Sequence, residues 1–195
     1  MLKPTRDQNL YIIFFLNTIY PLSKGLKDYL SANIRHCKFK KNEIILQTGK
    51  ECDKLFLIKK GLVRGFMSLD DTDITIWIDS ENEIFTSVSG FFRQKMSKET
   101  IQCLEDTYCD YLTYEDYQYC LNHFPEMNHI SRILLEEYYA LAEYRVYLTR
   151  IPNAEKRLEY FTQNSNSNII NRIPKKYLAS FLAMRPETLS RLLKN

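Results

Sequence analysis

Glycine is scarce in this sequence, with 5 residues in a chain of 195. So few glycines leave little room for flexible linkers or for a glycine-rich loop around a phosphate. Long apolar runs are scarce as well, since the run YIIFFL at 11–16 is far shorter than the ~20 residues that a helix needs to cross a bilayer. With no spanning segment and no export signal, we expect a cytoplasmic protein without a membrane partner.

The sequence also lacks the groups of cysteine and histidine that metal sites need. Its 5 cysteines include no CxxC pair, so we expect reduced thiols, mostly in the core or half-buried, and no disulfide framework, zinc site or iron–sulfur cluster. The 3 histidines share no ligand spacing, which argues against a β-roll enzyme with a catalytic metal, and we expect no cofactor. These residues are Cys37, Cys52, Cys103, Cys109, Cys120, His36, His123 and His129.

Charge is distributed unevenly along the chain. Residues 145–195 carry 10 Lys and Arg against 3 Asp and Glu, whereas residues 1–144 carry 17 against 21. A basic end on an acidic body is expected when that end meets a polyanion such as DNA. A basic surface that only faces solvent would give the same counts.

The first two thirds of the chain predict helices followed by short strands. Apolar residues at three- and four-residue spacing predict helices over 7–35, with a second helix beginning at Pro21. From about residue 37 to 113, β-like runs alternate with turn signals, of which DDTD at 70–73 is a hairpin loop, and a short helix is expected around Gly90. Runs at this spacing predict an antiparallel barrel or sandwich.

A long helix is predicted from about Glu126 to Thr149, with Pro125 in its first turn. A stripe of mostly apolar residues recurs over about three heptads, which favours a seam between the helices of two subunits. An ordinary helix packed on its own domain would show the same pattern. The predicted seam consists of Met127, Leu134, Tyr138, Leu141, Arg145 and Leu148.

Two short helices are predicted at the end of the sequence, at 175–183 and 186–194. Pro186 suits the first position of the second helix, where its missing N–H is no loss. The short turn between the helices, the small Ala179 where they cross and the apolar positions that join them are typical of a helix-turn-helix.

The second of these helices has a polar outer face. Glu187 and Arg191 are four residues apart and therefore neighbours, so in a major groove Arg191 could bind guanine and Glu187 could accept from cytosine. The alternative is an exposed ion pair between the two on a packing helix. Thr188 would bond a phosphate, and the lysines would meet the DNA backbone. The predicted DNA-binding residues are Lys175, Lys176, Glu187, Thr188, Ser190, Arg191 and Lys194.

Three segments resemble the Crp/Fnr family of bacterial regulators. IPKKYLASFLAMRPETLSRLLK is similar to the family's DNA-binding end, in which IP-x-x-x-(I/L)-A-x-x-L leads into x-ETLSR. NAEKRLEYF resembles the AEERL-x-x-F segment that follows the family's dimer helix, and FKKNEIILQTGKECDKLFLIKKGLVRGF resembles the opening of its β-roll. The β-roll anchors are Phe39, Ile44, Leu46, Gly49, Leu55, Ile58, Gly61, Val63 and Arg64.

The resemblance covers nearly the whole chain and implies an α+β fold. An N-terminal antiparallel β-roll sensor of jelly-roll or cupin type, flanked by helices, would be followed by a long dimerisation helix and a helix-turn-helix domain. The three parts are expected at residues 1–125, 126–150 and 151–195.

Three positions depart from the family pattern in the helix-turn-helix. Pro186 stands where many members have an arginine, so one base contact is expected to be missing. Ala183 stands where a turn glycine is common, and Arg185 takes the N-cap position that Ser or Thr usually fills. The missing cap is expected to cost about 1 kcal/mol.

The resemblance also bears on what the β-roll could sense. Members that bind cyclic nucleotides carry Gly-Glu for the ribose and, about ten residues on, Arg-Ser/Thr-Ala for the phosphate. The matching segment here, SENEIFTSVSGFFRQKMSKETIQCLED, has no Gly-Glu, and the arginine's place falls on Ser97. We therefore expect no cyclic AMP binding through the usual contacts. The residues considered for an effector pocket are Phe85, Phe91, Phe92, Arg93, Ser97 and Lys98.

Together these patterns predict a DNA-binding transcription regulator of Crp/Fnr type that reads a pseudo-palindromic operator as a homodimer. Its two recognition helices would enter successive major grooves about 34 Å apart. The expected partners are double-stranded DNA, a second copy of the chain and, for an activator, RNA polymerase. The alternative is a ligand-binding or scaffolding β-roll that acts through a protein partner, and an enzyme is not expected.

Overall fold

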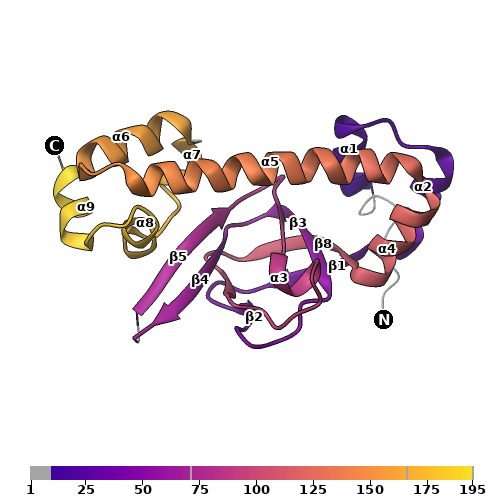
Figure 1. Cartoon of the computed structure of the whole chain (residues 1–195), viewed down its shortest axis with the longest axis horizontal. Helices are drawn as coiled ribbons and strands as arrows, with labels where there is room; N and C mark the ends of the chain where they lie inside the picture. Colours follow the sequence, from indigo (N-terminus) through magenta and orange to yellow (C-terminus); the bar gives the residue numbers. More distant parts are fainter. Residues whose placement is uncertain (1–9, 71, 166, 195) are drawn as a thin grey trace.

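The structure is a computed structural model that describes residues 10–70, 72–165 and 167–194 (Figure 1). Helices α1 (Leu10–Ile19) and α2 (Lys24–Asn33) lie at one end, and a β-roll fills the middle. The long helix α5 (Pro125–Arg150) runs across the roll to the C-terminal helices at the other end. The predicted order of β-roll, flanking helices, long helix and C-terminal helices is confirmed.

In the described residues, eight antiparallel strands form two sheets of four. The strand order is β1-β8-β3-β6 in one sheet and β2-β7-β4-β5 in the other. The strands are β1 (Arg35–Phe39), β2 (Ile44–Leu46), β3 (Lys54–Lys60), β4 (Val63–Leu69), β5 (Thr72–Asp79), β6 (Ile84–Phe85), β7 (Thr100–Cys103) and β8 (Thr107–Thr113). Two helices complete the roll, α3 (Val88–Phe91), which is the short helix predicted around Gly90, and α4 (Tyr114–His123).

The interior of the roll lies between the two sheets and includes Phe56, Val63, Trp77 and Ile101. Every second residue of β5 from Thr75 to Asp79 is buried, as the pleat of a strand with one inward face requires. Gly65 on β4 allows a close approach, because a Cβ atom there would lie 2.1 Å from the Trp77 ring.

The start of the second helix differs from the prediction. Pro21 lies before α2, which begins at Lys24 after Ser23, whose hydroxyl accepts a hydrogen bond from the amide of Leu26. Serine satisfies an otherwise unpaired N–H group at the helix start, whereas proline has no side-chain acceptor to offer. The predicted hairpin is present, but its loop is shorter than 70–73, because Thr72 and Asp73 already belong to β5 and pair with Leu69 and Ser68. Residue 71 lies outside the described residues, as do residues 7–9 of the first predicted helix.

Helix α5 joins two hydrophobic cores. Met127 and Ile130 at its beginning pack with α1, α2 and α4, while Leu148 near its end packs with the C-terminal helices. Leu62 and Leu104 of the β-roll belong to that second core as well. The division of the chain at 125 and 150 stays a prediction, since α5 contributes to the packing at both ends.

The C-terminal region consists of four helices, α6 (Ala154–Asn164), α7 (Ser167–Ile170), α8 (Lys175–Phe181) and α9 (Pro186–Leu192), in the part of the chain that the structure describes. All five cysteines are free, with Cys37 half-buried and the other four buried. No helix among the described residues is both long enough and apolar enough to cross a membrane.

Candidate functional site

Helices α8 and α9 form the predicted helix-turn-helix. Leu178, Leu182 and Leu189 are buried between them, and the amide of Met184 donates to the carbonyl of Ala179 across the turn. Ala183 has a φ of +48°, a left-handed conformation that glycine adopts at no steric cost. This backbone conformation explains why a turn glycine is common at this position.

Arg157 on α6 fixes this turn from inside. Its side chain is only 8% exposed, and it donates from Nη1 to the carbonyls of Leu182 at 2.6 Å and Ala183 at 2.7 Å. Nε and Nη2 of the same guanidinium donate to the carbonyl of Ile151 at 3.0 and 2.6 Å. One buried cation therefore ties the end of α5 to the helix-turn-helix.

The outer face of α9 is open to solvent. Glu187 and Arg191 are exposed, and no ion pair joins them in the described part of the chain. Thr188 and Ser190 are half-buried on the same helix. Arg185 makes no side-chain cap, so the N-terminal amides of α9 that a cap would satisfy stay available to another acceptor. The three predicted phosphate-contacting lysines, Lys175, Lys176 and Lys194, are exposed as well.

The first helix of the motif is docked on the β4–β5 hairpin. Ser180 Oγ accepts from the amide of Thr75 at 2.9 Å and donates to the carbonyl of Asp73 at 3.0 Å. The guanidinium of Arg64 lies 3.7 Å from the centre of the Tyr177 ring, and its Nη2 lies 2.7 Å from Asp73 Oδ2. Arg64 is 2% exposed, so its contact with Tyr177 is a buried, directional joint between the roll and α8, and Asp73 holds the guanidinium in place.

A second joint lies between α7 and α8, where Arg172 binds two carboxylates of the roll. Its Nη1 and Nη2 each lie 2.8 Å from an oxygen of Glu81, while Nε and Nη2 lie 3.0 and 2.7 Å from the oxygens of Glu105. The hydrogen bonds from Arg172 lower the pKa of Glu81 to about 2. The bidentate geometry fixes the orientation of the segment as well as its position.

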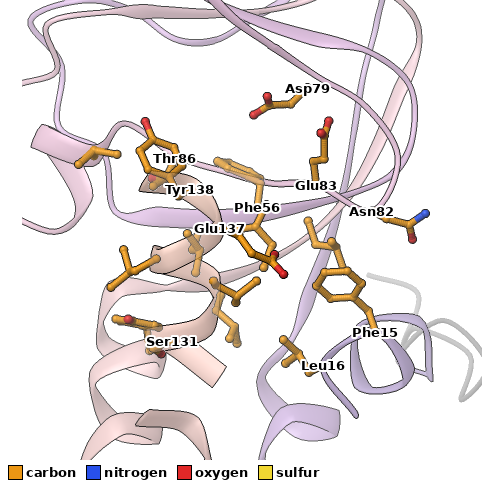
Figure 2. A pocket seen from close by; sticks show the side chains of 18 of the residues that line it. Phe15, Leu16, Phe56, Asp79, Asn82, Glu83, Thr86, Ser131, Glu137 and Tyr138 are labelled. Atoms are coloured by element: carbon orange, nitrogen blue, oxygen red, sulfur yellow. The ribbon is translucent and has the colours of Figure 1, made fainter. Parts of the chain in front are cut away.

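The largely apolar cavity lies between α5, α1 and the roll (Figure 2). It has a volume of about 180 Å³. Its walls include Phe15 and Leu16 of α1, Leu57 and Leu112 of the roll, and Leu134 of α5. We refer to it as the α5 cavity.

One end of the α5 cavity is acidic. Asp79, Glu83 and Glu137 line it, and Figure 2 shows Asp79 and Glu83 close to each other. Arg145 also lines the cavity, but its Nη2 lies 3.4 Å from Asp79 Oδ1, a long contact for an ion pair. Burial, together with the charge of Glu83, raises the pKa of Asp79 to about 8, while Arg145 opposes the shift.

A buried hydroxyl lies on the α5 side of the same cavity (Figure 2). Ser131 is 8% exposed, and its Oγ atom makes no hydrogen bond of normal geometry with any residue that the structure describes. Burial raises the pKa of Tyr117, and the nearby Ser131 opposes that rise. Among residues 10–70, 72–165 and 167–194, no group of three or more His, Cys, Asp or Glu side chains has the arrangement of a metal site.

Residues 36–124 match the family model of the cyclic nucleotide-binding domain. The chain as a whole has the fold of the Crp/Fnr regulators. It is similar to FixK2 from Bradyrhizobium japonicum, with a TM-score of 0.71, 15% identity and 83% of each chain covered. A putative Crp/Fnr regulator from Eubacterium rectale matches with a TM-score of 0.70 and 20% identity, over 89% of this chain and 82% of that one.

The c-di-GMP-responsive regulator CLP from Xanthomonas campestris also shares the Crp/Fnr fold, with a TM-score of 0.71 and 12% identity over 88% of this chain and 90% of that chain. The comparison with curated proteins gave no match. Because the structural relatives are less than 25% identical to this chain, they show its fold only. Any ligand has to be inferred from the residues of this chain.

Most residues considered for the effector pocket do not line the α5 cavity. Phe92 does, whereas Phe85 and Phe91 are buried in hydrophobic cores, because β6 and α3 turn these rings inward. Arg93 and Lys98 are exposed. Ser97, which the resemblance aligns with the phosphate arginine, is buried, and its Oγ lies 3.0 Å from Ser87 Oγ and 2.7 Å from the carbonyl of Glu99.

Most residues predicted for the seam contact other parts of the same chain, although Leu141 is 43% exposed. Met127 and Leu148 are buried in the chain's own cores, and the remaining four, Leu134, Tyr138, Leu141 and Arg145, line the α5 cavity. This stripe is therefore largely occupied within one chain. Another heptad stripe, displaced by one residue, consists of Leu135, Tyr139, Ala142 and Val146. Leu135 also lines the α5 cavity and Ala142 is half-buried, whereas Tyr139 and Val146 are 66% and 61% exposed.

Three features of the site were missed by the sequence analysis. Arg157 was visible only as part of the AEKRL motif, and nothing marked it as a ligand of the turn carbonyls. The Arg172 joint and the acidic end of the α5 cavity join residues far apart in the chain, such as Glu81 with Arg172 and Asp79 with Arg145. No local pattern signals either.

Proposed function

We propose that this protein is a homodimeric, DNA-binding transcription regulator of the Crp/Fnr type that does not bind cyclic AMP through the family's usual contacts. The observation that carries the proposal is the exposed polar face of α9 on a turn held by Arg157. A helix held in this way can enter a major groove, where Arg191 reaches guanine and Glu187 reaches cytosine.

The test of DNA binding is selection of bound sequences from random double-stranded DNA, followed by anisotropy titrations at several salt concentrations. Arg191→Ala should weaken binding to the selected sequence by about 5- to 150-fold, equivalent to ~1–3 kcal/mol, and relax the preference at one base pair. Lys175→Ala should weaken binding to all sequences and reduce the salt slope by about 1.

A matched control is Arg93→Ala, which removes the same charge from an exposed position on the roll. Its affinity for the selected sequence should stay that of the parent protein. Absence of any selected sequence, or equal losses in Arg191→Ala and Arg93→Ala, would remove the support for base recognition by α9.

The dimer is proposed to form along the exposed stripe of α5. Tyr139 and Val146 are open in the single chain and lie seven residues apart, so pairing with a second α5 would bury them. Val146→Glu should shift the sedimentation coefficient at micromolar concentration to that of a monomer. Leu69→Glu changes an equally exposed aliphatic residue at the hairpin end and should leave the dimer intact. A parent protein that sediments as a monomer contradicts the dimer.

We expect no cyclic AMP binding because the place of the phosphate arginine carries no positive charge. Ser97 supplies no cation at the phosphate arginine's place, and Glu99, two residues on, adds a carboxyl group that accepts a hydrogen bond from Trp77 Nε1. A cyclic phosphate near these groups would be repelled and would lack a bidentate partner. Calorimetry with cyclic AMP should give no binding heat. Micromolar binding that is abolished by substitution of Ser97 or Lys98 would overturn this part of the proposal.

A further inference from the structure

The α5 cavity carries chemistry that points to a ligand of another class. Its walls are mainly apolar, formed by side chains such as Phe15, Leu57, Leu112 and Leu134. A dry cavity of about 150 Å³ is known to accept a benzene ring, so 180 Å³ suits about one aromatic ring with a short arm. The apolar walls thus set the size and character of the ligand's body.

The charges at one end set the sign of its polar group. Among the described residues that line the cavity are three carboxyl groups, Asp79, Glu83 and Glu137, and one cation, Arg145, which already faces Asp79. An anionic ligand would therefore lie mainly against carboxyl groups. A protonated amine would instead supply the positive charge that the carboxyl groups lack.

The raised pKa of Asp79 is consistent with an amine ligand. Desolvation and the charges of Glu83 and Glu99 raise its pKa to about 8, against the opposing effect of Arg145. This raised pKa favours the protonated form of Asp79 in the ligand-free chain. A cation placed beside it would favour the carboxylate and release that proton to solvent.

We propose that the α5 cavity binds a small arylalkylamine or a comparable apolar amine, with its ring between α1, α5 and the roll and its ammonium group at Asp79 and Glu83. The buried Ser131 hydroxyl, which lacks a hydrogen bond of normal geometry, gives the cavity a second polar point on α5 (Figure 2). An amine that also carries a hydrogen-bond acceptor could bind the Asp79 and Glu83 carboxyl groups and the Ser131 hydroxyl at the same time.

Binding would act on the rest of the molecule through α5. The helix places Glu137 and Arg145 at the acidic end and Leu148 in the core of the C-terminal helices. An ammonium group that draws Asp79 away from Arg145 would alter the contacts that hold the helix to the roll. This coupling rests on the proposed regulator function, whereas ligand binding is measured without DNA, so the two can fail separately.

The test compares three probes of similar shape by calorimetry with the full chain: 2-phenylethylamine, 2-phenylethanol and 3-phenylpropionate. The amine should bind at least 10-fold more tightly than the other two at pH 7. Its apparent binding enthalpy should differ between phosphate and Tris buffers, because the proton released by Asp79 is taken up by the buffer. Emission from Trp77, the only tryptophan, provides a second readout, since its Nε1 donates to Glu99 at 2.7 Å.

Substitutions then locate the ammonium group. Asp79→Asn should weaken amine binding at least 10-fold, abolish the buffer dependence and leave binding of the alcohol unchanged. Glu83→Gln removes the other carboxylate proposed to hold the ammonium group and should also weaken amine binding at least 10-fold, so it is the second variant in case Asp79→Asn fails to fold. Glu155→Gln on α6, exposed and outside the cavity lining, is the matched control and should bind like the parent.

Two results would overturn the proposal. Tightest binding of 3-phenylpropionate, lost in Arg145→Met, would assign an anionic ligand to the cavity. No binding of any of the three probes at millimolar concentration would mean that the cavity is not a site for ligands of this size. Either result leaves the DNA-binding proposal to be judged by its own experiments.

Discussion

Replacing Arg157 should have the largest effect of any single change in the C-terminal region. The guanidinium satisfies the carbonyls of Ile151, Leu182 and Ala183 at distances between 2.6 and 3.0 Å. Arg157→Met keeps much of the apolar stem but leaves three carbonyl oxygens without this partner. At about 1 kcal/mol for each unsatisfied group, the loss is about 3 kcal/mol, or roughly 150-fold in the equilibrium constant for folding of this region.

Urea unfolding followed by circular dichroism measures the global effect, and hydrogen exchange of amides in α8 and α9 measures the local one. Faster exchange should be concentrated in these two helices and in the end of α5, with little change in the strands. Arg150→Met removes an exposed arginine a few residues away and serves as the control. An Arg157→Met variant that stays within 1 kcal/mol of the parent, with unchanged exchange in α8, would refute the reasoning.

Two further changes probe the roll and its joint with the C-terminal helices. Since the pKa of Glu81 is lowered to about 2, its contribution to folding is present above about pH 4.5 and is lost as the pH falls towards 2, so Arg172→Met should flatten this part of the stability–pH curve. A curve as steep in the variant as in the parent, measured by urea unfolding at each pH, would contradict the role of Arg172. Gly65→Ala places a Cβ atom 2.1 Å from the Trp77 ring, and it should lower stability by about 2 kcal/mol and shift the Trp77 emission. Unchanged emission and stability would show that the strand pair relaxes without cost.

The sequence was most informative where the chemistry is local. Alternating runs and turn residues predicted the hairpin between β4 and β5, and the heptad pattern predicted α5 almost to its ends. Pro186 marked the start of α9 because a proline at the first helical position loses nothing. Ala183 was identified as a departure from the family pattern, in which a glycine is common at this position. Its φ of +48° shows that the position takes a left-handed backbone conformation.

The packing partners of α5 could not be predicted from the same pattern. The helix has two apolar stripes displaced by one residue, one through Leu134, Tyr138 and Leu141 and one through Leu135, Tyr139 and Ala142. Periodicity gives both stripes nearly equal weight, and only the position of the roll decides which of them is occupied within the chain. The acidic end of the cavity was hidden for a related reason, because Asp79, Glu83 and Arg145 meet only after three separate segments pack together.

The uninterrupted course of α5 has a mechanical consequence. Between residues 126 and 150 the helix contains neither proline nor glycine, the usual positions of a kink, so it turns as a stiff rod. Its 26 residues span about 39 Å, and a tilt of ~1° at the end near α1 displaces the other end by ~0.7 Å. Leu148 and the carbonyl of Ile151, which Arg157 binds, lie at that far end. A small rotation beside the roll would therefore move the C-terminal helices packed at that end, and in the proposed dimer it would change the distance between the two copies of α9.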